Sequence, residues 1–265
     1  MKLAANHPIA ICSWSLQDDL PLIRQTMAEL ELEHIHASVA IMQSDGWEEN
    51  NWIVTNTMIG FPQEDYSTLD SIKKTGGIMP DDCWERNRVL ALDAIDFTAR
   101  RGVDFLSLHA GFIDHTDAEG YRKFCGRMTE LADAAQAQNI MLLLETGQET
   151  AEDLRNCLED LAHPALGVNF DPANMILYDK GDPISAVRTL APWVKHVHIK
   201  DAVKTTVPGE WGTEVPWGDG EVKSNDFIQA LEQIGYVGAL AIEREAGDTR
   251  KNDIKLAVDR LGGNK

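Results

Sequence analysis

The sequence predicts an α/β fold, a (β/α)8 TIM barrel that forms a single domain over residues 1–265. Eight apolar or alternating segments are each followed by a helix-patterned segment or a long connection, and eight such units in about 250 residues are typical of this barrel. An open doubly wound sheet is the alternative, but no glycine-rich phosphate turn follows the first predicted strand. No linker or low-complexity segment interrupts the sequence.

The elements follow from two periodicities. Apolar runs or strict alternation predict strands at residues 7–13, 33–41, 53–61, 103–109, 140–146, 165–171, 194–200 and 238–244. Apolar positions three and four apart predict helices at residues 18–32, 81–101, 117–138, 150–161, 182–190 and 224–234, and the segment 248–260 closes the chain. Asp81 is the expected N-cap of the helix at 81–101. The stretch 62–80 is predicted to be a long loop, and 205–222 an ordered loop over the barrel mouth.

Charge and composition exclude several classes of function. Asp plus Glu number 43 against 24 for Lys plus Arg, which gives a net charge of -19. Such a surface repels polyphosphates, so we expect no nucleic-acid partner, although a local basic pocket can still take a small phosphorylated substrate. No apolar run approaches the length of a membrane span, and the N-terminus carries no signal-peptide pattern.

The cysteines indicate a reducing compartment. Cys12, Cys83, Cys125 and Cys157 are scattered and form no CxxC pair. We therefore expect free thiols rather than disulfides or metal ligands, and a cytoplasmic protein. Oligomeric state stays open, with a homo-oligomer among the expectations.

One predicted strand is too polar for ordinary core. Alternation in residues 194–200 places His196, His198 and Lys200 on one face. Three polar side chains on a buried face cost several kcal/mol unless each has a partner. The strand therefore lines a polar site or faces water at a sheet edge, and a closed barrel has no edge.

The ends of four consecutive strands carry metal-ligand side chains. Glu145, Asp171, His198 and Glu243 end the last four strands, and each follows the previous one by one βα repeat, with a longer connection before the last. Catalytic groups of such barrels lie at these ends, and three adjacent carboxylates need a cation to neutralise them. The set suits a divalent ion such as Mn²⁺, Mg²⁺, Co²⁺ or Zn²⁺.

The motifs LLLET, GVNFDPANM, VHIKDA and AIERE resemble the sugar phosphate isomerase/epimerase group of xylose-isomerase-like barrels, which is similar in turn to the endonuclease IV group. In ketose 3-epimerases of that group a Glu-Asp-His-Glu set binds Mn²⁺, and both glutamates are acid/base groups. The resemblance implies these roles for Glu145, Asp171, His198 and Glu243.

The sequence also departs from those patterns. Asn174 stands where the 3-epimerases have a histidine, and their arginine after the histidine ligand is absent, so Lys200 or Lys204 would replace it. His109 matches one extra ligand of the endonuclease IV cluster, but Asn174 replaces another. Together with the acidic composition, this argues against DNA repair.

We therefore expect a metal-dependent isomerase or epimerase of a sugar or keto-sugar, phosphorylated or not. Glu145 and Glu243 would exchange a proton beside a carbonyl through a metal-stabilised enediolate. The alternative is a lyase or dehydratase that uses the same intermediate for β-elimination. A non-catalytic sugar-binding barrel is a third hypothesis, which the paired glutamates disfavour. We expect five substrate contacts: His109, Asn174, Lys200, Trp14 and Trp217. Trp211 is a further candidate.

Overall fold

Eight parallel strands close into a ring in the computed structural model, which describes residues 3–4 and 6–262. Each strand pairs with the next along the chain, and the last, β11, pairs with the first, β2. The barrel strands are β2 (His7–Cys12), β3 (His34–Ser38), β4 (Ile53–Ile59), β5 (Phe105–Leu108), β6 (Met141–Glu145), β7 (Leu166–Phe170), β8 (Val194–Ile199) and β11 (Leu240–Ile242). The predicted (β/α)8 barrel is confirmed.

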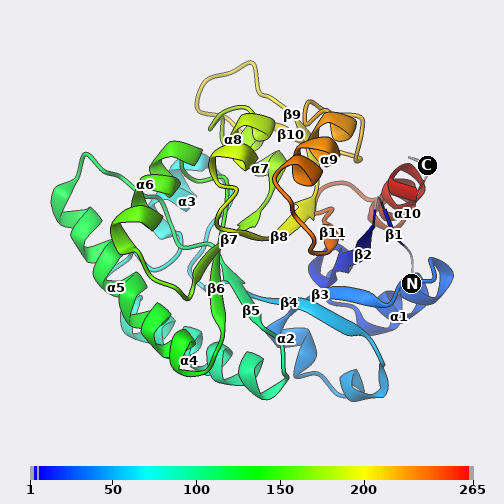
Figure 1. Ribbon diagram of the computed structural model, residues 1–265, viewed down its shortest axis with the longest axis horizontal. Coiled ribbons are helices and arrows are strands. Elements are labelled where there is room, and N and C mark those ends of the chain that lie inside the picture. The colour runs from blue at the N-terminus through cyan, green and yellow to red at the C-terminus, as the bar shows by residue number, and fades with distance from the viewer. Residues whose placement is uncertain (1–2, 5, 263–265) are drawn as a thin grey trace.

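Helices surround the ring of strands (Figure 1). They are η1 (Ser13–Leu16), α1 (Leu20–Glu29), α2 (Val39–Met42), η2 (Trp47–Glu49), α3 (Leu69–Thr75), α4 (Trp84–Arg100), α5 (Ala118–Ala137), α6 (Ala151–Leu161), α7 (Pro172–Leu177), α8 (Pro183–Thr189), α9 (Ser224–Gln233) and α10 (Arg250–Gly262). Among the described helices, none combines the length and apolar composition needed to cross a membrane.

Two predictions between β4 and β5 are wrong. The expected loop at 62–80 contains helix α3, which begins where Thr68 accepts a hydrogen bond from the Ser71 amide at 3.0 Å. Asp81 does not cap α4. Its carboxylate instead binds Lys123 and Arg127 of α5, because charge-assisted hydrogen bonds to two cations are stronger than a hydrogen bond to a backbone amide at a helix terminus.

The loop predicted at 205–222 is partly a hairpin. Strands β9 (Asp201–Val203) and β10 (Thr213–Val215) pair antiparallel, and β1 (Leu3–Ala4) pairs antiparallel with β2. Asp201 fixes the second half of the loop, because its carboxylate accepts the amides of Gly218, Gly220 and Val222 at 2.9–3.1 Å. A Cβ at Gly220 would lie 2.2 Å from Asp201 Oδ1, so only glycine permits this contact.

The main apolar core lies between strands and helices, whereas the ring encloses polar side chains. Small residues on β2 and β11, among them Ala10, Cys12 and Ala241, are fully buried. The room that they leave is taken by imidazoles, including those of His36 and His198, whose ring centroids are 5.1 Å apart. The interior is therefore shaped for a polar cluster rather than filled by large aliphatic residues.

Candidate metal centre and active site

The structure brings together the four side chains predicted as metal ligands. Glu145 ends β6, Asp171 follows β7 and caps α7, His198 lies in β8 and Glu243 follows β11. Their ligand atoms all lie within 4.8 Å of one another, and the residues are between 0 and 5 % exposed. His198 Nδ1 is 3.1 Å from Glu243 Oε2, 3.5 Å from Glu145 Oε1 and 3.6 Å from Asp171 Oδ2.

This donor set fits a divalent cation. Among the described residues, His198 Nδ1 and Asp171 Oδ2 are buried without a hydrogen-bond partner. A buried polar atom without a partner costs about 1–3 kcal/mol. A bound cation would supply the missing partner of both atoms. Three carboxylates and one imidazole nitrogen match the hard and intermediate ligands that Mn²⁺, Mg²⁺, Co²⁺ and Zn²⁺ accept.

The carboxylates are held ionised. Burial opposes their charge, yet the pKa of each lies below its ordinary value. The ammonium of Lys200 lowers the pKa of Asp171 and of Glu243, and the imidazole of His109 lowers that of Glu145. Ionised carboxylates are the form that can bind a cation or accept a proton.

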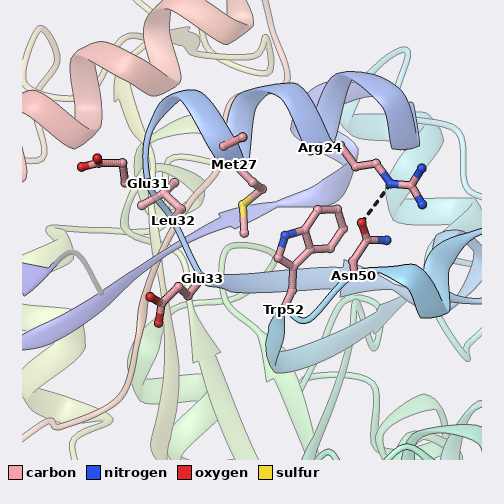
Figure 2. Close-up of a pocket in the computed structure, with 8 residues that line it drawn as sticks. Arg24, Met27, Glu31, Leu32, Glu33, Asn50 and Trp52 are labelled. Atoms are coloured by element: carbon pink, nitrogen blue, oxygen red, sulfur yellow. Dashed lines mark hydrogen bonds between the residues drawn. The ribbon is translucent and has the colours of Figure 1, made fainter.

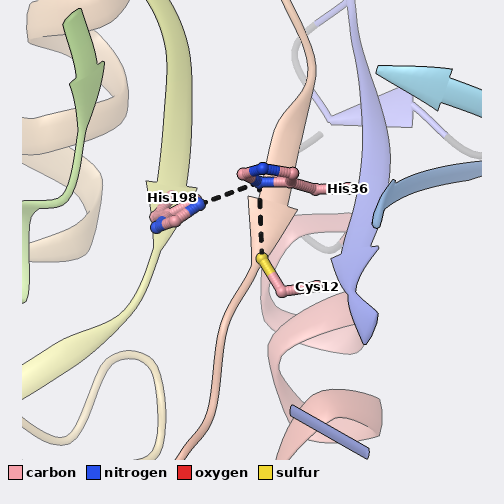
Figure 3. Close-up of side chains that lie close together, drawn as sticks. All are labelled: Cys12, His36 and His198. Atoms are coloured by element: carbon pink, nitrogen blue, oxygen red, sulfur yellow. Dashed lines mark hydrogen bonds between the residues drawn. The ribbon is translucent and has the colours of Figure 1, made fainter. Parts of the chain in front are cut away.

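His36 lies between His198 and Cys12 and contacts both side chains (Figure 3). His36 Nδ1 lies 3.0 Å from His198 Nε2 and 3.9 Å from Cys12 Sγ. Burial lowers the pKa of His36 well below its usual value and raises that of Cys12 to about 12, so both side chains are neutral. His198 Nε2 thus contacts His36 Nδ1 and, at 3.1 Å, Asn169 Nδ2, which leaves His198 Nδ1 directed at the carboxylates.

His196 belongs to this support rather than to the ligand set. Its Nδ1 donates to Asn169 Oδ1 at 2.9 Å, and Asn169 Nδ2 in turn donates to Glu145 Oε2 at 3.4 Å. Thr55 Oγ1 lies 3.0 Å from the other ring nitrogen. Hydrogen bonds across the barrel thus orient Glu145 from behind.

A pocket of about 500 Å³ opens above the cluster and includes four of the predicted substrate residues: Trp14, His109, Asn174 and Lys200. Asn174 Nδ2 donates to Glu145 Oε1 at 3.1 Å. Trp14 Nε1 donates to Glu243 Oε1, and Lys200 Nζ lies 3.1 Å from Glu243 Oε2. These residues therefore also hold the two glutamates in place.

Trp217 is not brought to this pocket, so its prediction as a substrate contact is corrected. It is 4 % exposed, and its ring packs edge-on against that of Phe227 of α9, with the ring centroids 6.2 Å apart. The cause is the anchoring of the adjacent loop by Asp201, which folds Trp217 into the outer core. Trp211, from the first half of the same loop, lines the pocket instead.

Several pocket residues escaped the sequence analysis. Tyr66 and Tyr178 line the wall, but nothing in their local pattern distinguishes them. Glu245 was within reach of prediction, since alternation after β11 places it on the same face as Glu243. Its carboxylate lies 2.8 Å from Lys200 Nζ.

A larger hollow, of about 640 Å³, lies at the opposite end of the barrel (Figure 2). Glu33 and Trp52, which precede β3 and β4, line it together with Arg24 of α1. None of the predicted site residues lines this hollow. Because catalytic groups of such barrels lie at the C-terminal strand ends, the pocket above the metal-ligand cluster is the candidate active site.

Two curated proteins resemble this chain over about half of its length. The 3-dehydroshikimate dehydratase of Bacillus anthracis is 24% identical over 157 residues, which are 52% of this chain and 55% of that protein. The inosose dehydratase of Clostridium tetani is 22% identical over 156 residues, 53% of this chain and 52% of that protein. The chain thus spans about half the length of the curated relatives it matches.

Solved structures match over nearly the whole chain. A xylose isomerase domain protein from Planctomyces limnophilus is 28% identical with a TM-score of 0.86, covering 97% of this chain and 96% of that one. D-psicose 3-epimerase from Clostridium cellulolyticum, solved with D-tagatose, is 18% identical with a TM-score of 0.66 (96% and 95% covered). A xylose isomerase-like protein from Mycobacterium smegmatis, solved with magnesium, is 19% identical with a TM-score of 0.71 (99% of both).

The comparisons agree with the architecture of the barrel. An epimerase is among the solved structures that share this fold, and two dehydratases are among the curated relatives. The sequence model described as "Xylose isomerase-like TIM barrel" matches residues 54–262, which includes all four clustered ligands. The chain belongs to the xylose isomerase-like TIM barrel family.

Proposed function

We propose that the protein is a divalent-metal-dependent isomerase or epimerase that moves a proton at a carbon beside the carbonyl of a sugar or keto-sugar. One observation carries this proposal: two buried glutamates, Glu145 and Glu243, share a single centre with Asp171 and His198, and Glu243 lines the pocket. Simple sugar binding needs hydroxyl partners and has no use for two converging ionised bases.

Proton transfer falls to the two glutamates. A bound divalent cation would act as a Lewis acid that polarises the substrate carbonyl and makes the neighbouring C–H group more acidic. Glu145 and Glu243 come from strands separated by β7 and β8, so one can remove the proton and the other return it. Asn174 donates a hydrogen bond to one oxygen of Glu145, and Trp14 donates one to an oxygen of Glu243. These contacts fix the positions of the two carboxylates before the substrate arrives.

A lyase or dehydratase is the second candidate, and the two dehydratases among the relatives favour it. Removal of the proton beside the carbonyl leaves a carbanion. If an oxygen substituent lies β to the carbonyl, this carbanion expels it and no proton returns to carbon. The substitution of Asn174 for the histidine of the 3-epimerases leaves the pocket compatible with either outcome. For the metal we propose Mn²⁺, with Mg²⁺, Co²⁺ and Zn²⁺ as the other candidates.

Metal analysis and isotope exchange test the proposal together. Purified protein should contain close to one divalent ion per chain, and Asp171→Asn should reduce it. The metal-loaded protein should exchange a carbon-bound proton of a ketose or keto-glycoside with D₂O, and mass analysis of the product separates epimerisation from elimination. Glu152→Gln, a change on the exposed face of α6, is the matched control. Bound metal with no exchange on any of these substrates would refute the proposed chemistry.

A further inference from the structure

The walls of the active-site pocket suit a ligand with apolar faces and hydroxyl groups. Aromatic rings of Trp14, Tyr66, Tyr178 and Trp211 line it, and aromatic faces pack well on the C–H faces of sugar rings. Among the described residues, Trp211 Nε1 is buried without a hydrogen-bond partner, as is one ring nitrogen of His109. Both atoms lie in residues of the wall and can bind hydroxyl groups.

The lysine and arginine side chains of the pocket offer no free cation to an anionic group. Among the described lining residues Lys200 is the one lysine or arginine. Its three N–H donors are taken by Glu245 Oε2 at 2.8 Å, Glu243 Oε2 at 3.1 Å and Asn174 Oδ1 at 3.4 Å, and Asp171 Oδ2 lies 3.5 Å away. A phosphate or carboxylate would have to displace a carboxylate to reach this ammonium.

The other groups that bind anions in proteins are also engaged. Arg244 is not among the lining residues, and its guanidinium is already paired with Glu214 at 2.7 Å and with Asp253 at 2.9 Å. At the start of α7, Asp171 Oδ1 already accepts the Asn174 amide at 3.0 Å. Guanidinium groups and helix N-termini are common phosphate ligands, and these two described examples are already engaged.

Carboxylates, by contrast, surround the mouth. Glu64, Glu214 and Glu245 line the pocket. Arg244 pairs with Glu214, and the amides of Phe61 and Gly77 donate to Glu64, whereas the Glu245 side chain is 51% exposed. An anion entering the pocket would lose its hydration and face these charges, and like-charge contacts of this kind cost several kcal/mol. Glu245 has a double effect, because it adds a negative charge and also occupies the ammonium of Lys200.

We propose that the pocket takes uncharged polyhydroxy ketones and rejects their phosphorylated or carboxylated counterparts, and that Glu245 sets this selectivity. The substrate class rests on the proposed function, whereas the discrimination against anions rests on the charges and contacts of the pocket. Repulsion of the wrong ligand is a common source of specificity.

Matched ligand pairs test this selectivity by binding and by turnover. We would measure dissociation constants on Mg²⁺-loaded protein for D-fructose against D-fructose 6-phosphate, and for scyllo-inosose against 3-dehydroshikimate. In every pair of which a member binds, the uncharged member should bind at least about tenfold more tightly, given the like-charge contacts. Glu245→Gln should reduce that ratio about tenfold, and should let inorganic phosphate raise the melting temperature of the metal-free protein. Glu232→Gln on the exposed face of α9 should change neither.

The outcomes separate the two proposals. An anionic member that binds as tightly as its uncharged counterpart, a ratio unchanged in Glu245→Gln, or no binding by any of the four ligands would each overturn the inference. Selective binding of uncharged ligands supports it, even if no ligand exchanges a proton with D₂O. Absence of exchange in that case counts against the proposed reaction alone.

Discussion

Asp171 combines two roles that mutation can separate. Its Oδ1 accepts the Asn174 amide as the N-cap of α7, while Oδ2 faces the metal-ligand cluster without a hydrogen-bond partner among the described residues. Asparagine caps helices about as well as aspartate does. We therefore expect Asp171→Asn to keep the cap and lose the charge needed for the cation, whereas Asp171→Ala loses both.

The chain provides its own control for capping. Asp182 precedes Pro183 as Asp171 precedes Pro172, and it caps α8 by accepting the Ser185 amide at 2.8 Å, away from the cluster. Asp182→Ala should cost about 1 kcal/mol, the usual worth of an N-cap, with or without metal. In a chain of this size that is a fall of about 2–4 °C in melting temperature.

Thermal unfolding with and without metal separates these effects. A cation present at one hundred times its dissociation constant stabilises the native wild-type protein by about 2.7 kcal/mol. Asp182→Ala should retain this gain in full. Asp171→Asn should lose most of this gain. After chelator treatment, the variant should be about as stable as chelator-treated wild-type protein. A metal-induced gain in Asp171→Asn equal to that of wild type would show that Asp171 is not a ligand.

Three further changes have defined expectations. Burial raises the pKa of Glu149 to about 8, so the folded protein keeps a proton that the unfolded chain releases. Stability should then fall by a few kcal/mol between about pH 4.5 and pH 8, and Glu149→Gln should flatten this slope in urea titrations at each pH. Glu145→Gln and Glu243→Gln should each lower the rate of proton exchange about 10²–10⁴-fold without unfolding the protein, and unchanged rates would exclude them as acid/base groups. Phe170→Ala should cost about 3–5 kcal/mol in urea unfolding, because this fully buried ring stacks on Phe227 at 5.9 Å; a loss under 1 kcal/mol would contradict the packing.

The strand ends could be predicted because two simple rules govern them. Period-2 alternation fixed which side chains of β8 face inward, and the carboxyl ends of parallel strands meet at one mouth. Glu145, Asp171, His198 and Glu243 therefore had to converge once eight strands closed. No knowledge of the loops was needed for this step.

The loops follow no such rule. Trp211 and Trp217 lie six positions apart in the same loop, yet one lines the pocket and the other is buried against Phe227. The position of Trp217 follows from the neighbouring amides that the Asp201 carboxylate accepts, which is a long-range contact without a local periodic signal. Helix α3 was missed for a related reason: it has seven residues, too few for an apolar stripe to repeat.

The polar face of β8 shows why this barrel interior serves a site rather than stability. Each polar group on that face is matched from a different strand or its end: His196 by Asn169 of β7, His198 by His36 of β3, and Lys200 by Glu243 after β11. Such groups add little net stability, since replacing a buried charged network with well-packed apolar residues is often neutral or stabilising. A chain that needed only a stable barrel would place aliphatic side chains here. Among the described residues, His198 Nδ1 and Asp171 Oδ2 instead have no hydrogen-bond partner and lie 3.6 Å apart, an arrangement that a bound cation would complete.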